Sequence, residues 1–463
     1  MGASGWIGSR GLDPIQRTTH HRLVPAKPDF EKLRSRLEPT STMVVEGRVS
    51  SLTGLTVRAR LPGARVGDTV EVLRVGGDCL LAEIRGFSGG EVVLVPLGDV
   101  RGVGPEDVVR QIGVPLSFKC GEAALGRILD GLGRPIDGRG PIAGAAPWPL
   151  MRPPPPPLAR PPIQRRLSMG VRAIDALLTA GEGQRIGLFA GSGVGKSTLM
   201  GQIARGTEAD AVVVALVGER GREVQDFIME SLGERGLARS VVVCSTSDEP
   251  ALLRLKAAFV ATAAAEYFRD RGARVLLLMD SVTRVARAQR EVGLAAGEPP
   301  VRRGYPPSVF ALLPQLLERT GASDRGSITA VYTVLVEGDD MEEPIADEVR
   351  GILDGHIVLS RELATRGQWP AIDVPASLSR LMDRLVPDEH RIAAARVRRW
   401  IATYERQRHL IELGAYQRGT DKDLDEAAAM MPGILVLLNQ GRDTASTGAE
   451  ASEHVVALAR RGR

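Results

Sequence analysis

Cysteine is scarce in this sequence and forms no pattern. Three cysteines occur among 463 residues, Cys79, Cys120 and Cys244, and no two of them form a CxxC pair. An odd and scattered set argues against a disulfide framework and favours a reducing compartment.

Long apolar runs are also absent. The longest run, Ala211–Val217, is far shorter than the roughly 20 residues that cross a bilayer. The N-terminus contains no apolar core of signal-peptide length. We therefore expect a cytoplasmic protein, and any membrane association must come through a partner.

Charge of one sign is not in excess either. Lysine and arginine total 60, and aspartate and glutamate total 56, which leaves a net charge of +4. This balance does not call for a nucleic acid partner, although the first forty residues and Arg391–Arg408 are locally basic. We interpret both basic segments as solvated surface.

The pattern along the chain predicts three folded domains after a flexible start. Residues 1–40 are expected to be flexible and basic, with a short helix at Phe30–Leu37. In residues 41–109, short β-type runs alternate with glycine turns, which predicts a small β-barrel. In residues 110–382, apolar runs such as RIGLFA and RVLLLMD alternate with helical stretches, which predicts a mostly parallel α/β core. Residues 383–463 have the pattern of a helical domain.

A phosphate-binding loop is predicted at AGSGVGKST, which follows the strand RIGLFA and opens a helix. Backbone N–H groups of such a loop and the helix N-terminus together form an anion cradle. Lys196 would reach the β- and γ-phosphates, and the Ser197 hydroxyl would bind Mg²⁺. The usual pattern is GxxxxGK followed by Ser or Thr, and its first glycine is replaced here by alanine. The residues predicted to bind nucleotide in this loop are Ala190, Gly191, Ser192, Gly193, Val194, Gly195, Lys196, Ser197 and Thr198.

Acidic residues follow two of the apolar runs. VLLLMD ends in Asp280, and a carboxylate at the end of a parallel strand can hold Mg²⁺ through water. VGERGREV contains Glu219, which we predict to orient the water that attacks the phosphate. Two more residues of this segment are candidates for the site. We predict Arg220 to be a further catalytic residue and Glu223 to be a further metal ligand. A surface ion-pair cluster is the alternative interpretation of this segment.

The resemblance to a known family rests on these elements and on four longer runs: DGLGRPIDG (130–138), LMDSVTRVARAQREVGLAAGEPP (278–300), RRGYPPSVFALLPQLLERTG (302–321) and VEGDDMEEPIADEVRGILDGHIVLSREL (336–363). Over about residues 41–440 the chain closely resembles the ATPases of flagellar and virulence type III protein export. These are relatives of the catalytic subunits of F-type and V-type rotary ATPases. The resemblance implies a RecA-like ATPase core and ATP hydrolysis with Mg²⁺. It also implies a homohexameric ring with nucleotide sites at the subunit interfaces.

The resemblance assigns two residues beyond the phosphate loop and its acids. Arg380, in SLSR, matches the arginine finger that a neighbouring subunit's site receives. Arg361, in VLSREL, is a less favoured candidate for that role. Trp369 occupies a position where the family usually has a tyrosine against the adenine, and an indole can also stack there. Core packing is the alternative role of Trp369.

The partners implied by the resemblance are those of protein export. They are a central coiled-coil stalk protein, a peripheral stator-like regulator, export chaperones and substrates, and the membrane export gate. ATP hydrolysis would release chaperones and unfold or load substrates at that gate. The runs VRRGYPPSVFALLPQLLERTG and ARAQREVGLAAGEPP look slightly more like the virulence branch than the flagellar one.

Three other functions remain as alternatives. A non-catalytic subunit of a mixed ring resembles the catalytic ones but lacks the glutamate equivalent to Glu219, which is present here. A hexameric RNA translocase needs stacking aromatics on its barrel, and Met43–Val109 contains a single aromatic, Phe87. A proton-driven ATP synthase subunit is disfavoured, by resemblance, by the run VEGDDMEEPIADE.

Overall fold

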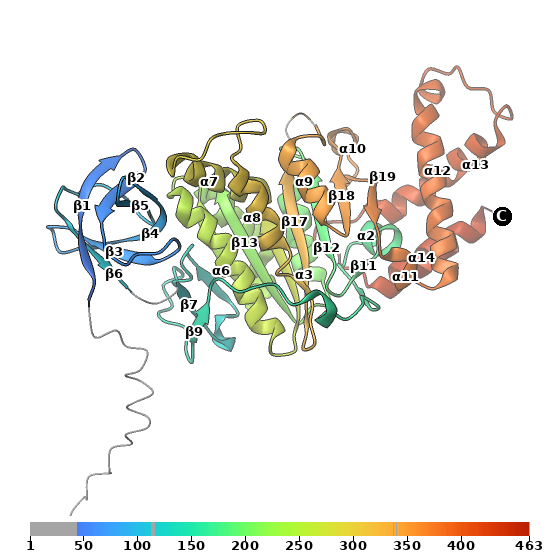
Figure 1. The fold of residues 1–463 in the computed structure, drawn as a ribbon. Helices are drawn as coiled ribbons and strands as arrows, with labels where there is room; N and C mark the ends of the chain where they lie inside the picture. The colour runs from blue at the N-terminus through green and yellow to red at the C-terminus, as the bar shows by residue number, and fades with distance from the viewer. Residues whose placement is uncertain (1–43, 113–115, 337, 339, 463) are drawn as a thin grey trace, which may run out of the picture. The chain divides into compact units, whose positions relative to one another are not determined.

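The computed structural model describes residues 44–112, 116–336, 338 and 340–462 (Figure 1). The helix predicted at Phe30–Leu37 and the rest of segment 1–40 lie outside them. Along the described residues the chain forms a β-barrel, a central α/β region and a C-terminal helical region, which confirms the predicted fold class. No helix in these ranges is long and apolar enough to span a membrane.

Six strands form the closed barrel, in the order β1-β2-β5-β4-β3-β6. They are β1 (Glu46–Thr53), β2 (Thr56–Arg60), β3 (Thr69–Leu73), β4 (Cys79–Ser88), β5 (Glu91–Pro96) and β6 (Val108–Gln111). Buried apolar side chains such as Val57, Ile84 and Leu94 fill the interior. β6 crosses the predicted domain boundary at residue 109 and pairs antiparallel with both β1 and β3. The barrel therefore continues to Gln111, because β6 is the strand that closes it.

The central sheet has nine strands, and all but β16 lie along the path β19-β18-β12-β17-β15-β13-β14-β8. Pairing is parallel throughout, except that β19 pairs antiparallel with β18 and β16 with β17. The strands are β8 (Arg127–Leu129), β12 (Arg185–Ala190), β13 (Ala211–Glu219), β14 (Ser240–Thr246), β15 (Arg274–Asp280), β16 (Gly321–Ala322), β17 (Ser327–Leu335), β18 (Gly355–Leu359) and β19 (Ile372–Ser379). β13 is buried at every position, as expected of a parallel strand covered on both faces.

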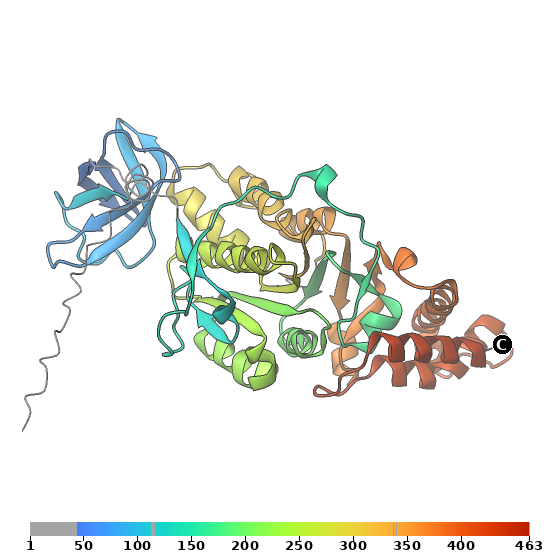
Figure 2. The same ribbon diagram turned by 90° about the horizontal axis from the view of Figure 1, so that it is seen from below.

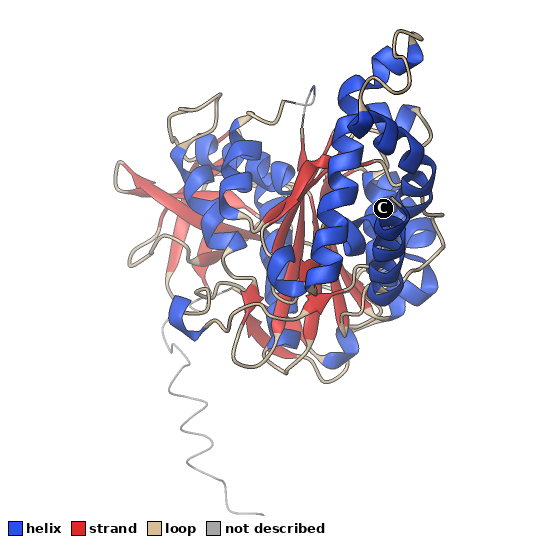
Figure 3. Ribbon diagram, turned by 90° about the vertical axis from the view of Figure 1, so that its right-hand side faces the viewer, coloured by secondary structure: helices blue, strands red, loops and turns tan. Residues whose placement is uncertain are grey.

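Helices cover both faces of this sheet (Figures 2 and 3). Val213 and Ala215 of β13 belong to the core on one face, with α6 (Ala251–Arg269), α7 (Val282–Ala295), α8 (Pro307–Leu317) and α9 (Pro344–Ile352). Val212 and Val214 belong to the core on the other face, with α2 (Arg172–Leu177), α3 (Lys196–Gly206) and the C-terminal helices. Parallel strands require crossover connections. The helices α3, α6, α7, α8 and α9 lie in these connections.

Short elements complete the α/β region. Before β12 they are β7 (Ser117–Cys120), η1 (Glu122–Ala124), β9 (Ala146–Pro149), η2 (Pro157–Ala159), β10 (Arg166–Leu167) and β11 (Ala180–Gly181). After β12 they are α4 (Gly221–Asp226), the π-helical η3 (Phe227–Leu232), α5 (Gly233–Ala238) and α10 (Arg361–Thr365). β8 joins the edge of the sheet although the strand–helix pattern in the sequence starts only at Gln184.

The C-terminal region is helical, as predicted, with strands ending at Ser379. Its helices are α11 (Met382–Leu385), α12 (Asp388–Glu412), α13 (Lys422–Leu438) and α14 (Gly448–Arg461). The Asp421 side chain caps α13 by accepting from two backbone N–H groups, and Thr447 and Glu450 form a capping box for α14. Trp400 of α12 is 2% exposed and belongs to the same apolar core as residues of α13 and α14.

A buried ion pair joins α6 to the end of α8. The Arg319 guanidinium donates to both carboxylate oxygens of Glu266, at 2.9 and 2.7 Å, and to the carbonyl of Leu150 at 3.0 Å. The side chains of both charged residues are at most 2% exposed. A fully bonded pair at such depth is sensitive to the loss of one partner, because the other charge is then left without compensation.

Candidate active site

The phosphate loop lies where the sequence predicts it, between a buried strand and a helix. β12 ends at Ala190, and α3 begins at Lys196. Gly193 and Gly195 adopt positive φ angles of 78° and 85°, which only glycine adopts without strain. Gly195 is the N-cap of α3 and offers no side-chain hydrogen bond, so the N-terminus of this helix remains able to bind an anion.

A cavity of about 800 Å³ opens over this loop. That volume is within the range of small-molecule and cofactor sites. Eight of the nine predicted loop residues line it, and Val194 does not because its side chain is buried in the core. The cavity is lined by Ala190, Gly191, Ser192, Gly193, Gly195, Lys196, Ser197, Thr198, Glu219, Arg220, Glu223, Arg284, Arg287, Leu335, Val336, Gly338 and Arg361.

Lys196 lies between two acidic side chains at the floor of the cavity. Its ammonium group forms an ion pair with Asp280 and lies 3.8 Å from Glu219 Oε1. Asp280 ends β15, is 2% exposed and also accepts a hydrogen bond of 2.8 Å from the Thr333 hydroxyl. The three residues predicted from separate motifs therefore converge on one point, although Asp280 lies behind Lys196 and does not line the cavity.

Glu219 has the electrostatic character of a catalytic carboxylate. It is the last residue of β13 and is 7% exposed. Burial raises its pKa to about 7, and a hydrogen bond with the Glu223 carboxyl and the charge of Asp280 act in the same direction. Lys196 and Arg284 oppose that rise. The same shared hydrogen bond lowers the pKa of Glu223.

One carboxylate oxygen of Glu219 makes no hydrogen bond to a described residue, and its charged neighbour is the Lys196 ammonium at 3.8 Å. Oε2 accepts a hydrogen bond of 3.1 Å from Arg284, whereas Oε1 is buried and accepts none from any described residue. A buried polar atom left in this way calls for a ligand or water. Oε1 can therefore accept a further hydrogen bond.

Arg284 is a site residue that the sequence analysis missed. It lies on the first turn of α7, four residues after Asp280, and donates to the Gly218 carbonyl at 2.6 Å and to Glu219. A helix that follows a strand-end acid on the catalytic edge of a parallel sheet places its first turn near the ligand. That position was the available signal. Arg287, one turn further along α7, also lines the cavity.

Arg220 and Glu223 lie at the mouth of the cavity. Both line it, both are exposed, and their side chains approach to 3.6 Å. Arg361 is exposed and lines the cavity of its own chain. That position places it on the phosphate side of its own site.

Trp369 lies at the rim, against the phosphate loop. A Cβ atom added to Gly195 would be 2.8 Å from Cζ3 of the indole, so the six-membered ring lies directly over this glycine. The indole is 44% exposed and does not line the cavity of the phosphates. The indole therefore lies beside the phosphate loop and outside the cavity.

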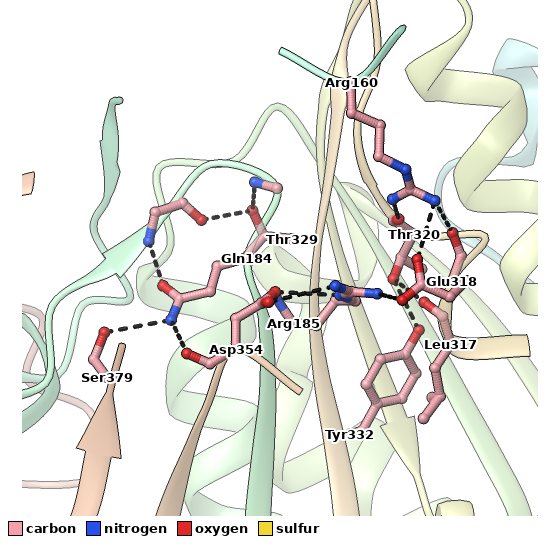
Figure 4. A network of polar contacts seen from close by, with 12 residues as sticks. Arg160, Gln184, Arg185, Leu317, Glu318, Thr320, Thr329, Tyr332, Asp354 and Ser379 are labelled. Atoms are coloured by element: carbon pink, nitrogen blue, oxygen red, sulfur yellow. Dashed lines mark hydrogen bonds and ion pairs between the residues drawn. The ribbon is translucent and has the colours of Figure 1, made fainter. Parts of the chain in front are cut away.

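Arg380 lies at the level where β12 begins, whereas the phosphate loop follows the end of β12. Its backbone N–H donates to the Asp354 carbonyl, and the Asp354 N–H donates to the carbonyl of Arg185, the first residue of β12. The Gln184 amide holds Ser379 and Asp354 in the same network (Figure 4). Because β12 rises about 3.3 Å per residue, roughly 16 Å separate this level from Ala190. That distance is longer than an arginine side chain, and Arg380 is exposed.

Mg²⁺ fits the donors at this site only together with a phosphate ligand. Among the described residues, no group of three or more His, Cys, Asp or Glu side chains could hold a metal. Ser197 offers a hydroxyl in the cavity, with the carboxylates of Asp280 and Glu223 nearby. Mg²⁺ is commonly bound by one or two protein oxygens together with water and substrate phosphates. The Ser197 hydroxyl and the two carboxylates are donors of this kind.

Comparison with known proteins places this site in a family. Residues 170–379 match the nucleotide-binding domain of the ATP synthase alpha/beta family, and residues 386–455 match the T3SS EscN ATPase C-terminal domain. The flagellum-specific ATP synthase of Bacillus subtilis (strain 168) is 52% identical over 409 residues, which cover 88% of this chain and 93% of that protein. The type 3 secretion system ATPase of Xanthomonas euvesicatoria is 53% identical over 401 residues, which cover 86% and 91%. The chain belongs to the family of type III secretion and flagellar export ATPases.

The three-dimensional comparison agrees with this export ATPase family. The assembled ATPase EscN from the type III secretion system of enteropathogenic E. coli matches with a TM-score of 0.85 and 47% identity, over 89% of this chain and 100% of that one. The resemblance stated from the sequence is confirmed, and the chain is an ATPase with ATP as its substrate. The RNA translocase and the non-catalytic subunit are therefore set aside.

Within this export ATPase the cavity is lined by charges of both signs. Lys196, Arg284 and Arg361 are among its basic residues, and Glu219 and Glu223 are acidic. The ion pair with Asp280, which lies behind Lys196, fixes the position of the ammonium group at the floor of the cavity.

Proposed function

We propose that this ATPase hydrolyses MgATP at a site shared by two adjacent subunits of a homohexameric ring. The observation that carries the proposal is the separation of Arg380 from its own phosphate loop. Lys196, Asp280 and Glu219 converge on one point, and Arg380 lies about 16 Å away at the far edge of the same sheet, by the rise of β12. A residue so placed can complete a neighbour's site but not its own.

Hydrolysis needs a positioned water and stabilisation of negative charge in the transition state. Lys196, Arg284 and the N–H groups at the start of α3 bind the phosphates. The carboxylate of Glu219 holds the attacking water at Oε1 and orients it in line with the terminal phosphoryl group. Arg380 of the next subunit approaches the oxygens of that group, where such a finger is worth about 10³–10⁵ in rate. Ser197 and, through water, Asp280 and Glu223 would hold Mg²⁺, and the metal would supply neutralisation of the phosphate charge.

Trp369 provides the base end of the site in this proposal. Its ring already lies against Gly195, and it is exposed enough to accept a second flat partner. Stacking of an adenine on an indole adds about 0.5–1.5 kcal/mol beyond area burial by analogy with aromatic pairs.

The ring and its partners are proposed from relatives. EscN has been solved in an assembled form and in complex with its central stalk EscO, and the latter structure matches this chain with a TM-score of 0.83. We extend this to a homohexamer here, with a central coiled-coil stalk facing the C-terminal helices. A peripheral stator-like regulator, export chaperones with their substrates, and the membrane export gate complete the set. The protein would work in the cytoplasm, attached to the inner face of the membrane through the secretion apparatus, without nucleic acid.

Between the two branches we propose injectisome use over flagellar use. The support is the sequence of residues 301–321 and 286–300, which look slightly more like the virulence branch. Relatives of both names are about equally similar to the chain. Expression in a strain lacking its injectisome ATPase should restore effector secretion, and expression in a strain lacking its flagellar ATPase should not restore motility. The reverse result would assign the protein to the flagellum.

ATP turnover against protein concentration tests the shared site. Turnover per subunit should rise steeply over the range in which rings form, and Arg380→Ala should lower the plateau by about 10³–10⁵-fold. Arg406→Ala is a matched control, because Arg406 is an exposed arginine on α12, outside the cavity. Turnover per subunit that does not depend on concentration would contradict a shared site.

A further inference from the structure

The backbone of Trp369 is held on both sides by two residues that follow α13. The Trp369 N–H donates to Oδ1 of Asn439 at 2.9 Å. The Gln440 N–H donates to the Trp369 carbonyl at 2.8 Å. Both bonds join residues about 70 positions apart in the sequence, so the end of a C-terminal helix fixes a residue at the rim of the nucleotide cavity.

The pair Asn439–Gln440 is itself fixed to the α/β region. Gln440 is 5% exposed, and its side-chain amide donates to the carbonyls of Gly170 and Thr444, at 2.8 and 2.7 Å. Its side-chain oxygen accepts from the Arg172 N–H at 2.7 Å. Every polar atom of this amide therefore has a partner, which makes Gln440 a firm support for its neighbour Asn439.

The segment that carries Trp369 is also joined to α12. Gly367, two residues earlier, has a φ of 78°, a conformation that allows this loop to turn. The ion pairs Arg366–Glu405 and Arg408–Glu362 join the same segment to α12, but they lie at the surface, where such pairs contribute little. The hydrogen bonds of the Trp369 backbone to Asn439 and Gln440 are the directional contacts between this residue and the C-terminal region.

We propose that Asn439 is a positioning residue for the base of the bound nucleotide. By accepting from the Trp369 N–H it keeps the indole over Gly195, so that the C-terminal helical region sets one wall of the base site. The proposal rests on the proposed stacking of adenine on Trp369. Its physical basis is pre-organisation: an indole that is already in place loses less conformational freedom when the base arrives. A partner that shifts α13 would thereby change the affinity for ATP without touching the phosphates.

Asn439→Leu removes the acceptor at nearly constant size, and Asn439→Asp keeps it. Asn439 is exposed, so neither change leaves a cavity in the core. We expect Asn439→Leu to raise the KM for ATP and the inhibition constant of ADP about three- to tenfold, which corresponds to the loss of one stacking contact. The kcat should stay within about twofold. Asn439→Asp should restore both constants to near the wild-type values.

Inorganic tripolyphosphate separates the base from the phosphates. It has the phosphates without the base, so its inhibition constant should be the same in wild type and Asn439→Leu. An equal rise for tripolyphosphate would overturn the proposal and place the effect on α3, which the same loop contacts through Gln202 and Arg205. An unchanged KM, or a lower kcat at constant KM, would overturn it as well.

Trp369→Ala distinguishes a failure of this inference from a failure of the proposed base site. If Trp369→Ala raises the KM for ATP and Asn439→Leu does not, the stacking of adenine on Trp369 is supported and the positioning role of Asn439 is refuted. If Trp369→Ala leaves the KM unchanged, the stacking itself fails. If Asn439 acts only through the indole of Trp369, the variant with both Trp369→Ala and Asn439→Leu should have the same KM for ATP as Trp369→Ala alone.

Discussion

Replacing Glu219 by glutamine tests the chemistry of the site most sharply. Glutamine has nearly the same shape, keeps a side-chain oxygen toward the cavity and lacks the negative charge. A positioned general base contributes about 10²–10⁴ in rate, and Glu219→Gln should therefore lower kcat by about that factor. Binding of ATP should remain within a few-fold, because Lys196 and the backbone of the phosphate loop are unchanged.

The raised pKa of Glu219 gives this prediction a pH dependence. Burial is the main cause of the rise to about 7, so the carboxylate is ionised above that pH and protonated below it. Because the ionised form holds the water, wild-type turnover should fall about tenfold per pH unit as the pH drops below 7. The residual turnover of Glu219→Gln should lack this step.

The same shift predicts an effect on stability with a definite sign. The folded-state pKa lies above the ordinary value of 4.5, so the native state binds the additional proton between about pH 4.5 and 7. Wild-type stability then falls as the pH rises through this window, because a buried carboxylate must ionise. Glu219→Gln should melt at a higher temperature than wild type at pH 8, and the difference should shrink towards pH 5.

The assay is steady-state phosphate release at saturating ATP between pH 5.5 and 8.5, with nucleotide binding measured in parallel. Glu234→Gln is a suitable control, because Glu234 is an exposed residue of α5 outside the cavity. Near-normal turnover by Glu219→Gln would refute the assignment of the water to Glu219. A loss of turnover that is matched by a loss of ATP binding would point to an electrostatic role in binding.

Three further outcomes follow from individual contacts. Arg319→Leu should destabilise the α/β region by about 3–5 kcal/mol, seen as a lower melting temperature, because the buried carboxylate of Glu266 would keep only Arg152, at 4.0 Å, as a charged partner. A melting temperature equal to that of wild type would contradict this. Arg284→Ala should lower turnover and move the pH midpoint upward, since Arg284 lowers the pKa of Glu219, and a downward move would remove Arg284 from the carboxylate's environment. Chelation of Mg²⁺ should stop phosphate release while weaker ATP binding persists, whereas continued turnover in chelator would exclude the metal role of Ser197.

Local sequence patterns were sufficient to predict most of the fold. The strand–loop–helix at Ala190–Lys196 and the acids that end β13 and β15 follow from runs of neighbouring residues, because strand ends and helix starts are encoded locally. The barrel was recognised from its alternating runs, but β6 is only four residues long, and its last two residues were assigned to the next domain. β8 was missed for a similar reason, since three residues give no periodicity.

Contacts between distant segments could not be predicted in the same way. The hydroxyl of Thr333 on Asp280 and the guanidinium of Arg284 on Glu219 join residues 53 and 65 positions apart. Nothing in the local sequence marks Asn439 as the partner of Trp369, because the two meet only after the C-terminal helices pack on the α/β region. The roles of Arg380 and Trp369 came from the family resemblance, and they stay predictions.

The central claim is that each ATP site takes Glu219 from one subunit and Arg380 from the next. Co-expression of Glu219→Gln and Arg380→Ala chains in equal amounts tests it directly, since neither variant forms a working site alone. In randomly mixed rings, a site works when a chain with intact Glu219 is followed by one with intact Arg380. Each condition holds for about half of the chains, so about a quarter of wild-type turnover should return. Mixed rings as inactive as either parent would show that Arg380 does not act across the interface.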